Sequence, residues 1–180
     1  YAMELSGRAI TMSKGDDIAM SVRAQRILFD RSGINGMIGG QTADVEAEKK
    51  GTVGSEELLS YIHREKTGAL IIAAMMAGAV LGGADEDEQA AVADIAMKIG
   101  LAFQIEDDIL DVLGDEALLG KPIGSDERNE KLTYVSLYGI DGAKEDVKEL
   151  TAKAHELLDG LPGDHAFLDG LFDELTHRES

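Results

Sequence analysis

The stretch FQIEDDILDVLGD, residues 103–115, places carboxylates inside an apolar segment. On a helix, residues three, four or seven positions apart share one face, so Gln104, Asp107, Asp108 and Asp111 would line a single stripe. Carboxylates in apolar company cost free energy unless they are paired, hydrogen-bonded or bound to a metal, and clustered negative charges also repel one another. Magnesium fits best, because it takes oxygen ligands and usually binds through one or two carboxylates together with substrate phosphates.

This stripe has two alternative interpretations. A solvated acidic face is common in a chain with 35 Asp and Glu residues, but the other acidic runs, at 84–88 and 115–119, fall in expected turns. An EF-hand is excluded, because counting from Asp107 puts Ile109 at the third loop position and Val112 at the sixth, where a ligand and a glycine are needed. The apolar setting therefore favours metal binding.

Two lysines add to this pattern. Lys66 stands in REKTGALII at the start of the most apolar run, where a lysine is most often a surface residue with a buried stem, and Thr67 beside it could hydrogen-bond to its own helix. Lys121 stands in the glycine-rich LLGKPIGSD, which resembles a phosphate loop only loosely because the GxxxxGK[ST] spacing is absent. Together with the acidic stripe they suggest a magnesium–diphosphate site.

The elements that must position these residues are helices. The apolar spacing predicts helices over residues 1–11, about 16–45, 55–81, 88–113, 131–139, 141–159 and 165–177, with a loop over 113–129. Gly33, Gly36, Gly39 and Gly40 would let the second of these bend or approach a neighbour closely. No alternating stretch indicates a strand, so we expect an all-α fold and a single helical domain over 1–180.

Composition narrows the class of protein. A net charge of −18 opposes binding to nucleic acid and to anionic membranes. The absence of cysteine excludes disulfides, thiolate metal sites and cysteine nucleophiles, and fits an intracellular setting. Residues 68–84 carry no charge but fall short of the ~20 residues of a spanning helix, so we expect a buried core helix and no membrane anchor.

The sequence resembles the trans-type polyprenyl diphosphate synthases, the family of the farnesyl and geranylgeranyl diphosphate synthases, and most of all their bacterial short-chain type. The segments that carry the resemblance follow the family's order: GGQTADV (39–45), IHREKTGALI (62–71), GLAFQIEDDILDVLGD (100–115) and LGKPIGSDERNEKLTYVSLYG (119–139). The third matches the family's second aspartate-rich motif. The resemblance implies an antiparallel helix bundle of the isoprenoid synthase type, a homodimer and a cytoplasmic location.

It also implies a reaction, the head-to-tail condensation of isopentenyl diphosphate with an allylic diphosphate, with Mg²⁺ as cofactor. Asp107 would be a direct metal ligand, and Asp108 and Asp111 would hold metal-bound waters or a further ligand position. The other matched positions are Lys66 and Lys121, which would clamp the diphosphate; Thr67 and Gln104, which would face the allylic cation; Gln41 and Asp44, near the cavity; and Lys131, which would support the loop.

One family motif is missing from this sequence. The first aspartate-rich motif, Asp-Asp-x-x-Asp, has no match, because the early pair Asp16-Asp17 is followed by Ile-Ala-Met. We therefore expect the sequence to begin about midway through a synthase, without the N-terminal helices. Two alternatives stay open: a non-catalytic regulatory or truncated subunit that retains half of the diphosphate site, and an acidic helical scaffold unrelated to diphosphates. The length of the product also stays open.

Overall fold

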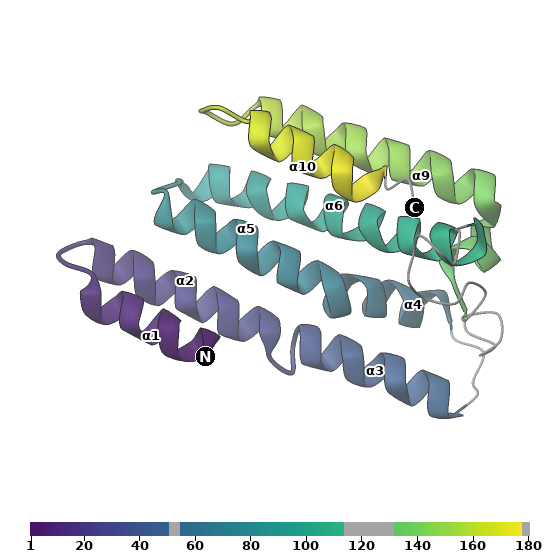
Figure 1. Ribbon diagram of the computed structural model, residues 1–180, viewed down its shortest axis with the longest axis horizontal. Helices are drawn as coiled ribbons and strands as arrows, with labels where there is room; N and C mark the ends of the chain where they lie inside the picture. Colours follow the sequence, from purple (N-terminus) through teal and green to yellow (C-terminus); the bar gives the residue numbers. More distant parts are fainter. Residues whose placement is uncertain (51–54, 114–131, 178–180) are drawn as a thin grey trace.

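The computed structural model describes residues 1–50, 55–113 and 132–177, and in these ranges the chain forms helices and no strand. The elements are α1 (Ala2–Met12), α2 (Asp17–Ser32), α3 (Met37–Lys50), α4 (Glu56–Ile62), η1 (His63–Gly68), α5 (Ala69–Leu81), α6 (Glu86–Leu113), α9 (Tyr134–Asp159) and α10 (Ala166–Thr176) (Figure 1). The all-α prediction is confirmed.

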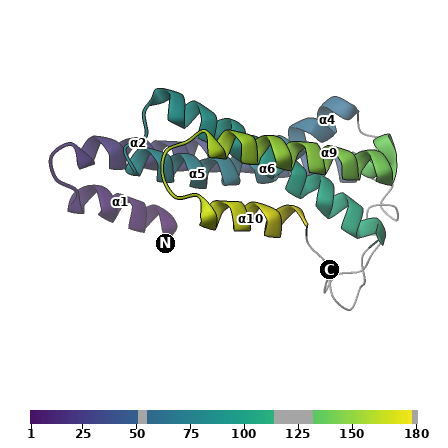
Figure 2. The same ribbon diagram turned by 90° about the horizontal axis from the view of Figure 1, so that it is seen from above.

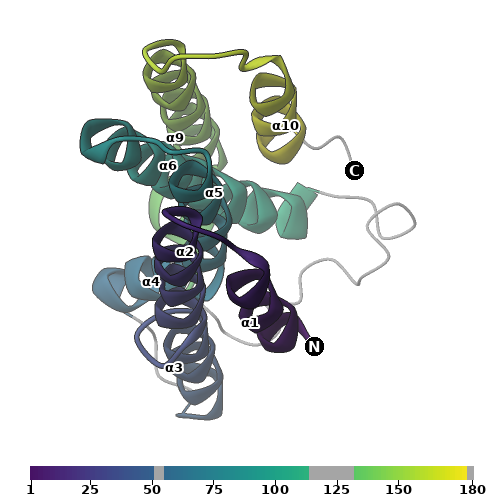
Figure 3. The ribbon, with the colours of Figure 1, turned by 90° about the vertical axis from the view of Figure 1, so that its left-hand side faces the viewer.

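The long helices lie side by side and run in alternate directions. Figure 3, which looks along the bundle, shows α2, α5, α6 and α9 stacked in that order, with α1 beside α2 and α10 beside α9. The same neighbours are in contact: α2 with α5, α5 with α6, and α6 with α9 and α10. Figure 2 shows the elongated bundle from above. This is the expected antiparallel helix bundle.

α6 is the central helix, and one of its faces is fully buried. The side chains of this face are spaced three or four residues apart: Ile95, Ile99, Ala102, Ile105 and Ile109, each at most 3% exposed. They pack against α9 through Val147 and against α10 through Phe172. Because this stripe must face α9 and α10, it also fixes the direction in which the polar residues of α6 point.

Most of the uncharged run 68–84 forms α5, and its buried residues are those of a core helix: Ala69, Ile72, Ala73, Ala77 and Val80. Val80 and Ala77 pack against Ala24 of α2. No helix in the described ranges has the length and apolarity that crossing a membrane requires. The expectation of a buried core helix is therefore confirmed.

The structure differs from the sequence-based helices at two places. The single helical region expected over 16–45 is two helices, because the chain turns between Ser32 and Met37. A Cβ atom on Gly36 would lie 2.0 Å from the carbonyl oxygen of Arg31, so this turn admits only glycine there. The helix expected over 55–81 is interrupted by η1, six residues of π-helix, which hydrophobic spacing does not reveal.

The helices expected over 131–139 and 141–159 are found as one element with a break. Gly139 has φ 72° and ψ 165°, so α9 consists of a short first segment and a long second one. A left-handed φ is accessible to glycine at little cost. The expected loop over 113–129 lies almost wholly outside the described residues.

Candidate functional site

The π-helical stretch η1 carries Lys66 and Thr67 and lies in contact with both α3 and α6. Glycines on both neighbours make these contacts close. A Cβ on Gly40 of α3 would lie 2.3 Å from the Lys66 amide nitrogen, and a Cβ on Gly100 of α6 would lie 2.9 Å from the Gly68 Cα. Backbone thus packs on backbone, which fixes the position of η1 between the two helices.

Lys66 is paired with a buried carboxylate. Its Nζ donates to Asp44 Oδ2 across 2.5 Å, and Asp44 is 3% exposed while a third of the Lys66 side chain is accessible. An ammonium has three N–H donors, so one pair leaves donors for an anion on the accessible side. The structure thus brings together two of the predicted site residues. Gln41, one turn before Asp44 on α3, is exposed.

The acidic stripe of α6 lies in the half of this helix that follows Gly100. Gln104 and Asp107 are half-buried, and Asp111 is 4% exposed. Asp108 points toward α9, because its Oδ2 accepts a hydrogen bond from the Tyr134 N–H at 2.7 Å. The predicted residues therefore lie on η1 and on the two helices packed against it, α3 and α6, with Lys66 and Asp44 in direct contact.

The predicted site residues suit a magnesium ion that is bound together with a diphosphate. In the described part of the chain, no group of three or more His, Asp and Glu residues converges enough to hold an ion alone. The donors on the stripe are nevertheless carboxylate and amide oxygens, the ligand type that a hard cation prefers. Magnesium commonly binds through one or two carboxylates plus phosphate oxygens. The donor set therefore fits a magnesium ion that arrives with a diphosphate.

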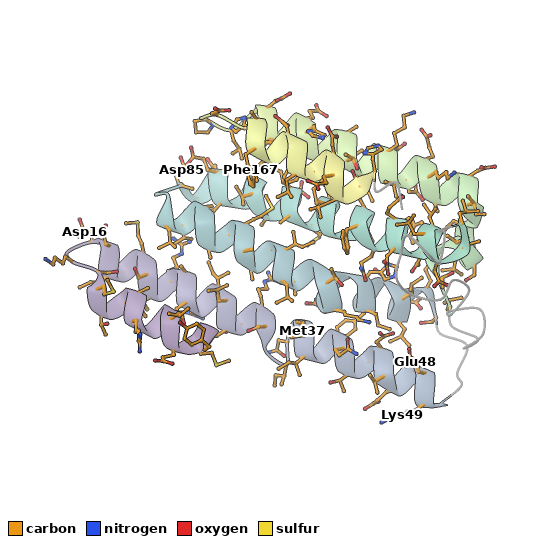
Figure 4. All side chains as sticks on the ribbon, in the orientation of Figure 1. Asp16, Met37, Glu48, Lys49, Asp85 and Phe167 are labelled. Atoms are coloured by element: carbon orange, nitrogen blue, oxygen red, sulfur yellow. The ribbon has the colours of Figure 1, made fainter. Side chains whose placement is uncertain are left out.

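One pair of acidic residues near the start of the sequence lies away from this site. The early pair Asp16-Asp17 is at the turn between α1 and α2, at the same end of the bundle as Asp85 at the start of α6 (Figure 4). The acidic stripe belongs to the other end of α6, so this pair is remote from it. Lys121 and Lys131 lie outside the described residues.

Sequence reasoning missed two features beside the site. His63, three residues before Lys66 and therefore about one turn away, is 5% exposed, and its Nε2 lies 3.7 Å from Asp108 Oδ2. The second feature is the start of α9, where Thr133 and Ser136 form a reciprocal capping box. The spacing of these two residues is a signal that could have been found, whereas a buried histidine has no signature of its own.

Two tyrosines anchor this first segment of α9. Tyr134 Oη donates to Asp146 Oδ2 at 2.8 Å, and Tyr138 Oη donates to Glu56 Oε1 at 2.5 Å. Burial, followed by the hydrogen bond to Asp146, raises the pKa of Tyr134 well above its ordinary range. The hydrogen bond to Glu56 raises the pKa of Tyr138. The segment that contacts Asp108 is thus held by α4 and by the second part of α9.

The sequence of this chain matches a known protein family. The polyprenyl synthetase family model matches residues 15–159. The chain belongs to the polyprenyl synthetase family. It is 46% identical over 147 residues to the farnesyl diphosphate synthase of Geobacillus stearothermophilus, which covers 81% of this chain and 48% of that protein. It is 38% identical over 176 residues to the Bacillus subtilis farnesyl diphosphate synthase, covering 97% and 59%.

Solved structures of this family share the fold. The Helicobacter pylori geranyltransferase, determined with magnesium and an isoprenyl diphosphate, superposes with a TM-score of 0.77 at 30% identity, covering 98% of this chain and 56% of that one. The Pyrococcus horikoshii geranylgeranyl pyrophosphate synthetase gives a TM-score of 0.78 at 29% identity, covering 94% and 62%. The chain thus spans roughly half to three-fifths of the length of these relatives.

Proposed function

We propose that this chain supplies the diphosphate-binding half of a magnesium-dependent prenyltransferase, a short-chain polyprenyl diphosphate synthase of isoprenoid biosynthesis. The reaction would join isopentenyl diphosphate head to tail with an allylic diphosphate and release pyrophosphate. The observation that carries the proposal is the Lys66–Asp44 pair on η1 and α3, next to the α6 segment with its stripe of carboxylates. Family membership supports the same reaction class.

Charged residues of both signs would take part in binding the diphosphate, the lysines through its oxygens and the aspartates through the metal ion. Lys66 keeps donors for diphosphate oxygens while Asp44 holds its ammonium in place. Asp107 is the proposed metal ligand, and Asp108 and Asp111 are proposed to hold metal-bound waters or a further ligand position. Magnesium, when bound, would neutralise the diphosphate and so make pyrophosphate a better leaving group. Lys121, outside the described residues, is proposed as a further diphosphate contact, and Lys131, also outside them, as a support for the loop that carries Lys121.

Polar residues of the site would stabilise the allylic cation, and apolar residues would shield it from water. Thr67 and Gln104 are both half-buried and sit on η1 and α6. Their oxygen dipoles can stabilise a positive charge that develops when the allylic C–O bond breaks, since preorganised dipoles act strongly in a site that excludes water. Gln41 stays a proposed binding residue on the exposed face of α3. The apolar helices α5 and α6 would keep water from the cation.

Prenyl transfer is the direct test. The chain is incubated with isopentenyl diphosphate and, separately, with dimethylallyl, geranyl and farnesyl diphosphates, in magnesium or in chelator. Product that requires magnesium and is lost in Asp107→Asn would support the proposed reaction. The accepted allylic substrate and the product length follow from the same assay.

Absence of product with every acceptor would overturn the catalytic proposal. A chain that still binds magnesium and pyrophosphate would then be the non-catalytic subunit with half a site. On the family resemblance we also propose a cytoplasmic homodimer. Sedimentation of the purified chain tests the dimer.

A further inference from the structure

A buried histidine joins the lysine-bearing element to the acidic stripe. The His63 side chain is 6% exposed and that of Asp108 is 12% exposed, and Nε2 of His63 lies 3.7 Å from Oδ2 of Asp108. This distance is too long for a direct hydrogen bond but falls within ion-pair range. His63 opens η1, and Lys66 follows it by three residues on the same π-helical stretch. A change in the position of His63 would therefore also move the backbone that carries Lys66.

Asp108 is already turned toward structural partners. The oxygen that faces His63 also accepts the Tyr134 N–H at 2.7 Å, a short bond of the charge-assisted kind. Tyr134 is the first residue of α9, so this carboxylate accepts one of the N–H groups that a helix start leaves without an intrahelical partner. The single atom Oδ2 thus contacts η1 on one side and α9 on the other, while its own residue belongs to α6.

Asp107 and Asp108 point in different directions and therefore cannot have the same role in the site. Consecutive residues on an α-helix point about 100° apart, so a carboxylate that faces α9 and His63 leaves its neighbour facing elsewhere. Holding Asp108 therefore adds to the buried apolar stripe in fixing the rotation of α6 about its axis and, with it, the direction of Asp107. Groups that orient metal ligands from outside the coordination shell typically contribute about 10–100-fold to metal affinity.

We propose that His63 and Asp108 are a positioning pair: by bridging η1, α6 and α9 at one carboxylate oxygen, they hold Asp107 and Lys66 in the relative place that a magnesium diphosphate requires. This inference rests on the proposed function. It gives His63 a role in the site and makes Asp108 a support for the metal ligand.

The test is a calorimetric titration of the chain with pyrophosphate at a series of magnesium concentrations. Removing the imidazole with His63→Ala should raise the magnesium concentration for half-maximal binding about tenfold or more. His63→Gln keeps a donor at a similar reach and should restore the wild-type value to within about threefold. Asp108→Asn keeps an acceptor for the Tyr134 N–H, so it should retain measurable binding, whereas Asp107→Asn should abolish it.

A purely structural histidine would predict something different. His63→Ala would then lower the melting temperature of the ligand-free chain but leave the magnesium dependence of the folded fraction at the wild-type value, and this result would overturn the proposal. So would loss of binding in Asp108→Asn as complete as in Asp107→Asn, a comparison that holds even where His63→Ala does not fold. If the wild-type chain fails to bind pyrophosphate with magnesium, the proposed function itself falls, and the inference with it.

Discussion

Substitution of Gly40 by alanine tests the packing that places Lys66. The added methyl carbon would lie 2.3 Å from the Lys66 amide nitrogen and 2.7 Å from the Glu65 carbonyl carbon. Non-bonded heavy atoms prefer separations of about 3.5–4.0 Å, so α3 and η1 would have to move apart by about 1 Å. Overpacking of this kind typically costs about 1–3 kcal/mol, and the atoms that the methyl group would meet belong to backbone, which puts the cost at the upper end.

Helix propensity works against this cost but is smaller. Replacing glycine by alanine inside a helix gains up to about 1 kcal/mol, which leaves a net loss of about 2 kcal/mol for Gly40→Ala. At roughly 2–4 °C per kcal/mol for a chain of this size, the melting temperature should fall by about 4–8 °C. The separation of α3 from η1 should also pull Asp44 away from Lys66 and weaken pyrophosphate binding in the presence of magnesium.

Gly78 provides the matched control. It is an exposed residue of α5, and a Cβ there meets nothing within 4 Å. Gly78→Ala should therefore show the propensity gain alone and raise the melting temperature by about 1–4 °C, without effect on pyrophosphate binding. Thermal unfolding followed by circular dichroism measures both variants. A Gly40→Ala protein as stable as Gly78→Ala would refute the close contact between α3 and η1.

Three further predictions follow from the helix ends and the site. Thr133→Ala should lower the free energy of unfolding by about 1 kcal/mol through loss of the capping box, while Thr133→Ser should not, as urea denaturation would show. Because the folded-state pKa of Tyr134 is raised above the ordinary 10.0, its contribution to stability should be complete below about pH 10 and be lost above it; ultraviolet titration of Tyr134→Phe should lack the last tyrosinate step, and an unchanged titration would contradict the assignment. Lys66→Met removes the cation that Lys66 supplies to the buried Asp44 carboxylate, so it should destabilise the chain as well as weaken pyrophosphate binding, whereas Lys66→Met combined with Asp44→Ala should recover part of the stability, as a thermal double-mutant cycle would measure.

Much of the fold could be predicted because its signals are local. The 3–4 spacing of Ile95, Ile99 and Ala102 predicts both the helix and the face it buries, and Ser55 marks a helix start, where its side chain accepts the Leu58 N–H. The π-helical stretch over 63–68 could not be predicted in this way. Its extra residue per turn is stabilised by packing against α3 and α6, a tertiary effect that apolar periodicity does not encode.

The site residues also differ in whether the sequence alone reveals them. The helical spacing of Asp107 and Asp111 and the type of their side chains indicate hard-cation chemistry directly from the sequence. The pairing of Lys66 with Asp44 crosses 22 positions of the chain and depends on Gly40 allowing close approach, so spacing alone does not show it. His63 is a similar case, because its partner Asp108 lies on another helix.

The central claim is that magnesium and a diphosphate bind together at α6 and η1. Thermal unfolding tests this claim most directly, measured with magnesium alone, with pyrophosphate alone and with both ligands. A ligand at a hundred times its dissociation constant stabilises a protein by about 2.7 kcal/mol, which for this size corresponds to a rise of roughly 5–10 °C. We predict that rise only when magnesium and pyrophosphate are present together, and its loss in Asp107→Asn. An equal rise in Asp107→Asn, or no rise with both ligands present, would contradict the account.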